Sequence, residues 1–197
     1  LENNGALDLK GEPPLQLSTE AMAALRRLGV RVGRHTVFMP ALIRPRAAHA
    51  LAILAHAAHA PPGHALFLPK PGAVSTPLTH PLSWPEAAAA GYRVCGCLAV
   101  RFDAAERLSA AVCAAASQGP AQLTPALAGL IARPARDLPP VLRALGFRQI
   151  APAAEAPGGW LPPNVKPPRR SPPVATGPFS PLSELLPIRP SRRRRRP

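Results

Sequence analysis

Five adjacent arginines, Arg192 to Arg196, have the plainest chemistry in this sequence. A guanidinium group stays charged at physiological pH and donates paired hydrogen bonds to phosphate oxygens. Such a run contacts phosphates without reading base sequence, and each phosphate that it neutralises steepens the salt dependence of binding. The same run also fits a solvating tail with no dedicated partner, or a nuclear-import signal in a eukaryote. RNA or DNA contact is therefore our first interpretation.

The chain as a whole is strongly basic. Its 197 residues include 24 Lys and Arg against 10 Asp and Glu, which gives a net charge of +14. A charge of this size attracts polyanions such as nucleic acid. Ala, Arg, Pro and Gly dominate the chain, as they do in proteins from GC-rich genomes. Codon bias is therefore an alternative source of part of the arginine excess.

Three cysteines, Cys95, Cys97 and Cys113, could in principle bind metal or form disulfides. Their number is odd, and the Cys-x-Cys spacing is tighter than the Cys-x2-Cys spacing of zinc knuckles. We interpret them as reduced thiols of a cytoplasmic protein.

Three histidines, His49, His56 and His59, could share one face of a helix. Histidine ligands need supporting carboxylates, and no Asp or Glu lies between Glu20 and Glu86. We therefore expect no metal site.

Motifs of catalysis are missing from the sequence. There is no Gly-x4-Gly-Lys phosphate loop, no Asp-Glu-x-His box and no Gly-x-Ser-x-Gly elbow. We expect no catalytic residue, no ATP hydrolysis and no cofactor in this chain alone. The start at Leu1 shows no signal peptide, and the longest apolar stretch, Ala47 to Ala60, is too short to span a membrane. The chain is expected to be a piece of a longer protein, away from membranes.

The pattern of apolar residues predicts a mainly helical α+β fold over residues 18–150. Helices are expected to begin after Ser18 or Thr19, at a capping box formed by Ser83 and Glu86, and after Asp103, and to end at glycines such as Gly29 and Gly91. The stretches rich in β-branched residues lie between the helices. An extended lead-in precedes this domain, and a proline-rich loop or arm interrupts it. The expected elements are the lead-in 1–17, helices 19–28, 45–59, 84–90 and 104–116, strands within 30–39, 92–95 and 98–102, and the loop 61–82 with a short strand at 65–68.

Residues 122–150 have the outline of a helix-turn-helix. Two short apolar helices are followed by Gly146 and a strand at 147–150, which would begin a wing. Asp137 is expected to cap the second helix, and Arg143 is its evident phosphate contact. Two packed helices without a nucleic-acid role are the alternative.

From Ala151 the composition changes. Residues 151–197 hold 13 prolines, and their 9 basic and 2 acidic side chains make this segment far denser in charge than the rest. This composition predicts a disordered, extended tail that reaches beyond the folded part.

Several segments, in the same order over about residues 20–150, resemble large alphaproteobacterial helicase-related proteins, which are similar to the mitochondrial RNA-degradosome helicase family. They are Leu28-Gly29-Val30-Arg31-Val32-Gly33, Met39-Pro40-Ala41-Leu42-Ile43-Arg44-Pro45, Ala90–Val94, Ala99–Asp103, Glu106–Leu108 and Val141–Arg148. The resemblance implies a superfamily 2 helicase whose ATPase domains, with their ATP and Mg, precede this region. The region would pack on that core and help to enclose single-stranded nucleic acid. The ATPase motifs are absent here, so the chain is either a C-terminal piece or a remnant reading frame.

Three functional hypotheses follow. The first is a non-catalytic helicase accessory domain at 18–150 that binds RNA or DNA phosphates nonspecifically, with single strands favoured and the ATPase core as partner in cis or in trans. The alternatives are a stand-alone protein-interaction module with a solubilising tail, and a helix-turn-helix DNA-binding regulator. The expected phosphate contacts are Arg31, Arg34, Arg143, Arg169, Arg170, Arg192, Arg193, Arg194, Arg195 and Arg196.

Replacing Arg192–Arg196 by serine in the full chain is expected to flatten the salt dependence of binding to single-stranded RNA or DNA. The loss of five phosphate contacts lowers the slope of log affinity against log salt by about 3 to 4. Titration of labelled oligonucleotides across a salt series measures it. An unchanged slope would assign these arginines to solvation alone.

Overall fold

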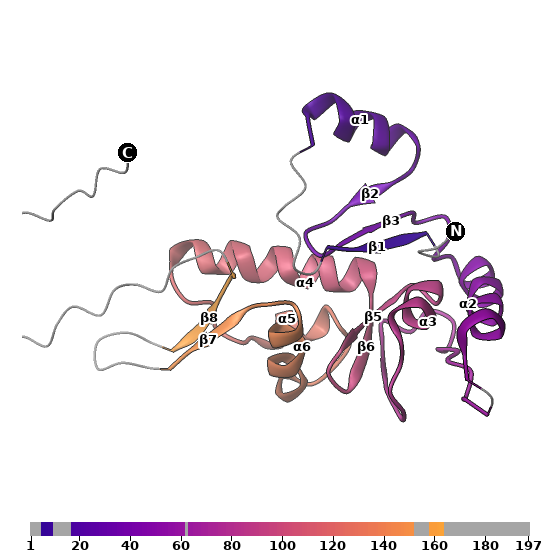
Figure 1. Ribbon diagram of the computed structural model, residues 1–197. Coiled ribbons are helices and arrows are strands. Elements are labelled where there is room, and N and C mark those ends of the chain that lie inside the picture. Colours follow the sequence, from indigo (N-terminus) through magenta and orange to yellow (C-terminus); the bar gives the residue numbers. More distant parts are fainter. Residues whose placement is uncertain (1–4, 10–16, 62, 152–157, 164–197) are drawn as a thin grey trace, which may run out of the picture. The chain divides into compact units, whose positions relative to one another are not determined.

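The structure is a computed structural model that describes residues 5–9, 17–61, 63–151 and 158–163. Within them it has six α-helices and eight short strands, which form three small antiparallel sheets (Figure 1). This confirms the α+β class that the sequence predicts. All of these residues belong to one compact unit, Leu1–Val165. Most of the lead-in, and the tail beyond residue 163, lie outside the described residues.

No helix in the described ranges has the length and apolar character needed to cross a membrane.

The N-terminal sheet has β3 (Thr36–Phe38) at its centre, between β1 (Ala6–Asp8) and β2 (Arg31–Val32). Before it, α1 (Thr19–Arg27) begins where the Ser18 hydroxyl accepts a hydrogen bond from Ala21 N at 3.1 Å. Gly29 follows this helix at φ +76°, the left-handed conformation that glycine adopts without strain. The helix and both strands of 30–39 confirm the sequence prediction, whereas β1 gives the lead-in a pairing that was not expected.

Two alanine-rich helices pack closely against each other. Helix α2 (Pro45–His59) has the predicted bounds, and α3 (Trp84–Ala89) begins with the predicted capping box, in which Glu86 accepts hydrogen bonds from the Ser83 backbone and hydroxyl. Small side chains let two helix backbones approach closely. The buried alanines are Ala48, Ala52 and Ala55 on α2, and Ala87, Ala88 and Ala89 on α3.

The middle sheet is formed by β4 (Ser75–Pro77), β6 (Leu98–Arg101) and β5 (Tyr92–Cys95), in that order. The strand expected at 65–68 is wrong, because the paired strand of the proline-rich segment lies at β4. Residues 65–68 are held instead by a side chain: Phe67 is buried and packs edge-on against Tyr92, with 5.9 Å between ring centroids.

The last part of the described chain has the element order of a winged helix. Helix α4 (Phe102–Ala115) is followed by α5 (Pro125–Gly129). A 3-10 turn (Ala135–Asp137) then leads into α6 (Leu138–Ala144). Strands β7 (Arg148–Ile150) and β8 (Gly159–Leu161) then form a hairpin, and Ala121 bridges to Trp160 of β8 (Figure 1). The three helices and the hairpin share one apolar core.

Strand β8 corrects the expectation that nothing after Ala151 forms sheet. Trp160 is only 2% exposed and packs in the core with α4 and α6, and Leu161 is also buried. A large aromatic side chain contributes enough apolar burial to hold a short strand in place. The sequence prediction missed β8 because it judged residues 151–197 by their average, proline-rich composition.

Two caps differ from prediction. Asp103 was expected to cap the helix after it, but α4 begins at Phe102 and its N-cap residue, Arg101, makes no side-chain cap. Asp137 occupies the N-cap position of α6, but its side chain does not bond the helix backbone. Asp103 bonds arginines instead, which satisfies its carboxylate more strongly than neutral amides would.

Substituting Trp160→Ala in the full chain is expected to lower the free energy of unfolding by about 3–5 kcal/mol, because it empties a buried aromatic site. Chemical denaturation measures the loss. Leu28→Ala is the matched control, since Leu28 is 70% exposed, and should change stability by less than about 0.5 kcal/mol. Equal, small effects of the two changes would mean that β8 is not part of the folded unit.

Candidate nucleic-acid interface

Exposed arginines lie on α6 and on the segments before and after it, in the winged-helix part of the chain (α4 to β8). Arg136, in the turn before α6, and Arg143, on α6, are both exposed and lie seven positions apart. Seven positions are two helical turns, so the two residues share one face. Arg148 at the start of β7 is also exposed. Arg136 has a carboxylate at 3.8 Å, that of Asp137, which is a weak pair at this exposure.

Arg143 is oriented by the hairpin. Its guanidinium lies 5.8 Å from the centroid of the Trp160 ring, a cation–π arrangement, and its Nη2 donates to Gln149 Oε1 at 3.1 Å. These contacts align the side chain along β7 and β8 while it stays exposed. A guanidinium ordered in this way loses less conformational entropy when it binds a phosphate.

A second basic segment is the turn between β2 and β3. The Glu106 carboxylate of α4 accepts three backbone hydrogen bonds from it: Arg34 N at 2.7 Å, and His35 N and Thr36 N at 2.9 Å each. A side chain at Gly33 would overlap this carboxylate, so glycine is required for the close approach. Glu106 therefore fixes the turn that carries Arg34.

The side chains of this turn also contact α4. Arg34 donates from Nη1 to the Cys113 sulfur at 2.8 Å, and His35 Nε2 lies 2.8 Å from the hydroxyl of the buried Ser109. The His35 ring lies 6.5 Å, between centroids, from that of Phe147. The turn is thus a neighbour of the segment that leads into β7 and Arg148.

Burial lowers the pKa of His35 to about 4, and the charges of Arg93 and Arg34 act in the same direction. The ring is therefore neutral at physiological pH and adds no charge to the basic surface. Its role is to hold the turn through Ser109.

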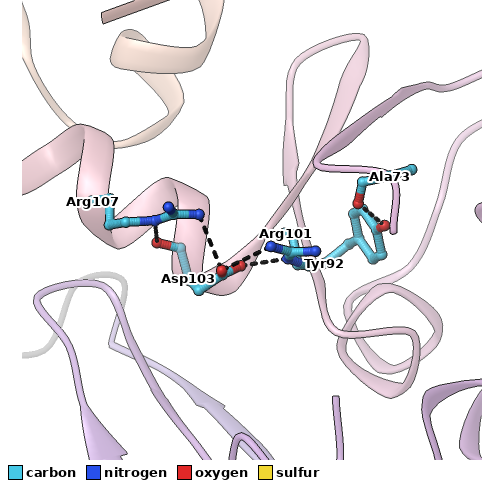
Figure 2. A network of polar contacts seen from close by, with 5 residues as sticks. All are labelled: Ala73, Tyr92, Arg101, Asp103 and Arg107. Carbon is cyan, nitrogen blue, oxygen red and sulfur yellow. Dashed lines mark hydrogen bonds and ion pairs between the residues drawn. The ribbon is translucent and has the colours of Figure 1, made fainter. Parts of the chain in front are cut away.

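Near the start of α4, positive charge is compensated. Figure 2 shows the Asp103 carboxylate between Arg101, at 2.5 Å, and Arg107, at 3.1 Å. Burial opposes ionisation of Asp103, but hydrogen bonds from Arg101 and the charges of both arginines outweigh it, so the pKa of Asp103 lies below its ordinary value. Beside this group, the Tyr92 hydroxyl donates to Ala73 O (Figure 2). Arg101 and Arg107 are therefore poorer phosphate contacts than the arginines with no close carboxylate.

The arginines predicted from sequence divide into three groups. Arg143 and Arg31 are exposed, and neither has a carboxylate partner among the described residues. Arg34 is exposed but is directed to Cys113. The remaining candidates lie outside the described residues: Arg169, Arg170, Arg192, Arg193, Arg194, Arg195 and Arg196.

Sequence reasoning missed Arg136, Arg148 and Glu106. The seven-residue spacing of Arg136 and Arg143 was a signal that could have found the first. Glu106 gave no such signal, because the three amides that it binds are about 70 positions away in the chain.

Among the described side chains, no three His, Cys, Asp or Glu groups are arranged to hold a metal ion. His49 and His59 are exposed, whereas His56 Nδ1 lies 3.6 Å from the buried Glu86 carboxylate and links α2 to α3. The supporting carboxylate that the local sequence lacks therefore comes from a different helix, and it reaches one histidine.

Comparison of the chain with models of protein families, with curated proteins and with solved structures finds no match.

The stability of the protein is expected to fall as the pH drops from about 6.5 toward 4. Unfolded His35 takes up a proton near pH 6.5, whereas the folded ring stays neutral down to about 4. The unfolded state therefore binds more protons in this window. His35→Asn, which can still bond Ser109, should flatten the pH dependence of the urea midpoint.

Asp103→Asn is the control for that experiment. The pKa of Asp103 is lowered, so its contribution is present above about pH 3.9 and is lost only below it. The difference between this variant and the natural sequence should stay constant from pH 6.5 to 4.5. A His35→Asn profile as steep as that of the natural sequence would contradict the assignment to His35.

Proposed function

We propose that this chain is the non-catalytic C-terminal region of a nucleic-acid helicase, and that its winged-helix part binds RNA or DNA phosphates. The observation that carries the proposal is the exposed pair of Arg136, in the 3-10 turn that leads into α6, and Arg143, on α6, which is the second helix of the helix-turn-helix outline. In helix-turn-helix proteins this helix is the one that meets nucleic acid. Arg148, on the adjoining hairpin, extends the same basic set.

The geometry of α6 favours phosphate contacts over base reading. Pro139, Pro140 and Ala144 are half-buried, and Arg143 is the exposed side chain of the helix. The turn between β5 and β6 packs on Pro140 through Gly96. A helix whose first turn is covered cannot enter a major groove along its full length, and base reading takes Asn, Gln or Arg side chains at its start. Binding without sequence preference is therefore proposed over a sequence-reading regulator.

The helicase part of the proposal rests on the resemblance of residues 20–150. In that arrangement ATP and Mg belong to the ATPase core, and this region adds a basic surface next to the strand that the core moves along. Single-stranded RNA or DNA is the proposed ligand, the ATPase core is the partner, and the cytoplasm is the proposed compartment. The arginines Arg192–Arg196 would lengthen the phosphate-binding surface.

The test uses the full chain with Arg192–Arg196 replaced by serine, so that the run of five terminal arginines does not contribute to binding. In this background Arg136→Gln and Arg148→Gln are each expected to reduce the salt slope for single-stranded RNA by about 0.7. The affinity should fall by a similar factor on unrelated sequences, because phosphate contacts do not read bases. Fluorescence anisotropy across a salt series measures both quantities.

Arg46→Gln, at an exposed position of α2, is the matched control and should leave the slope unchanged. If all three variants behave alike, or if no binding survives without the five terminal arginines, the winged-helix part is not the binding surface. A loss confined to one oligonucleotide sequence would instead support a sequence-reading regulator.

A further inference from the structure

Helix α2 has its large apolar side chains on the outside. The positions that it buries are alanines, Ala48, Ala52 and Ala55, whereas Ile53 is 50% and Leu54 is 66% exposed. A helix that packs on one core only normally directs its largest apolar side chains inward. Here α2 packs so closely against α3 that only alanine fits between them. Ile53 and Leu54 are therefore not needed to fill the inner face of α2.

The exposed residues form a stripe at helical spacing. Positions 50, 53, 54, 57 and 58 follow the pattern i, i+3, i+4, i+7 and i+8, all are apolar, and all are exposed. Leu66 and Leu68, in the segment after α2, are a further 37% and 39% exposed. Four of the six large exposed apolar side chains among the described residues therefore belong to α2 and this segment. Ile53 and Leu54 are the large side chains of the stripe itself, and exposed apolar groups gathered on one helix face mark an interaction site more often than scattered ones do.

The charge around the stripe has one sign. From residue 21 to residue 85 the sequence contains no Asp or Glu. Arg44 and Arg46 at the start of α2 are exposed. A partner that covers the stripe meets cations at its edges, so carboxylates on the partner are complementary.

We propose that the outer face of α2 is a docking site for an amphipathic helix of another protein, with a Leu- and Ile-rich stripe flanked by Asp and Glu. The stripe of α2 spans two helical turns, which suits helix-on-helix packing. The partner's carboxylates pair with Arg44 and Arg46. This inference does not depend on nucleic-acid binding, since it uses a different helix and a different surface.

Two other occupants fit the stripe less well, one because of charge and the other because of side-chain size. A second copy of this chain would bring the cationic edges of two α2 helices together, which costs affinity instead of adding it. An anionic membrane would satisfy the cations, but interfacial helices insert large apolar faces rich in Trp, Phe and Leu. The stripe of α2 is three-fifths alanine by position, which suits close contact with another helix.

The probes are four labelled synthetic helices. Three share a Leu/Ile stripe and differ in their flanking residues, which are Glu, Gln or Lys; the fourth has the composition of the Glu peptide with its stripe scrambled. We expect the Glu-flanked helix to bind the full chain at least tenfold more tightly than the Gln-flanked and the scrambled peptides, and the Lys-flanked helix not to bind. The scrambled peptide measures what net charge alone contributes.

Leu54→Glu should weaken binding of the Glu-flanked helix at least tenfold. Leu28→Glu is the control, because Leu28, the C-cap residue of α1, is 70% exposed against 66% for Leu54, and the added charge is the same. Since both positions are exposed, thermal unfolding should show that both variants fold. Equal binding of the scrambled and striped peptides, or equal effects of the two substitutions, would overturn the proposal. The proposal would also be overturned if the peptides did not bind, and Leu54→Glu instead abolished self-association of the chain or its binding to phosphatidylserine vesicles.

Discussion

A buried guanidinium holds the N-terminal part of the domain to the rest. Arg93 of β5 is 4% exposed, and a charge placed there would be costly without close partners. It pairs with Asp8 of β1 at 2.8 Å, donates to Thr36 Oγ1 and His35 O at 3.1 Å each, and lies over the Trp84 ring. Removing any one partner leaves part of a buried charge unsatisfied, so the position of the N-terminal sheet is tightly constrained. Because the basic turn between β2 and β3 belongs to this sheet, its position is fixed by the same contacts of Arg93.

Helix α4 contacts this turn with one face and packs into the winged-helix core with the other. Glu106, Ser109 and Cys113 lie on one face and contact the turn, whereas Leu108 and Val112 are buried with α5, α6 and the hairpin. One rigid helix therefore carries both basic segments. The apolar stripe of α2 lies on a different element.

Local rules account for most of the elements that the sequence predicts. The bounds of α2, the capping box at Ser83 and the glycine after α1 all depend on residues a few positions apart, and the structure confirms each. The two short helices and the strand expected within residues 122–150 also depend on local signals, and α5, α6 and β7 lie there. The failures are also local: Asp103 has a capping residue's chemistry, but Arg101 and Arg107 offer it charged partners, which amides cannot match.

The sequence by itself determined the α+β class, the order of the helices and the excess of positive charge, because periodicity, capping and composition act within one or two turns of chain. Only the tertiary structure decided that Trp160 closes the wing, that Glu106 binds amides about 70 positions away, and that Ile53 and Leu54 face outward. These depend on which surfaces meet, and a single helix with two apolar faces cannot specify in advance which one the core will take.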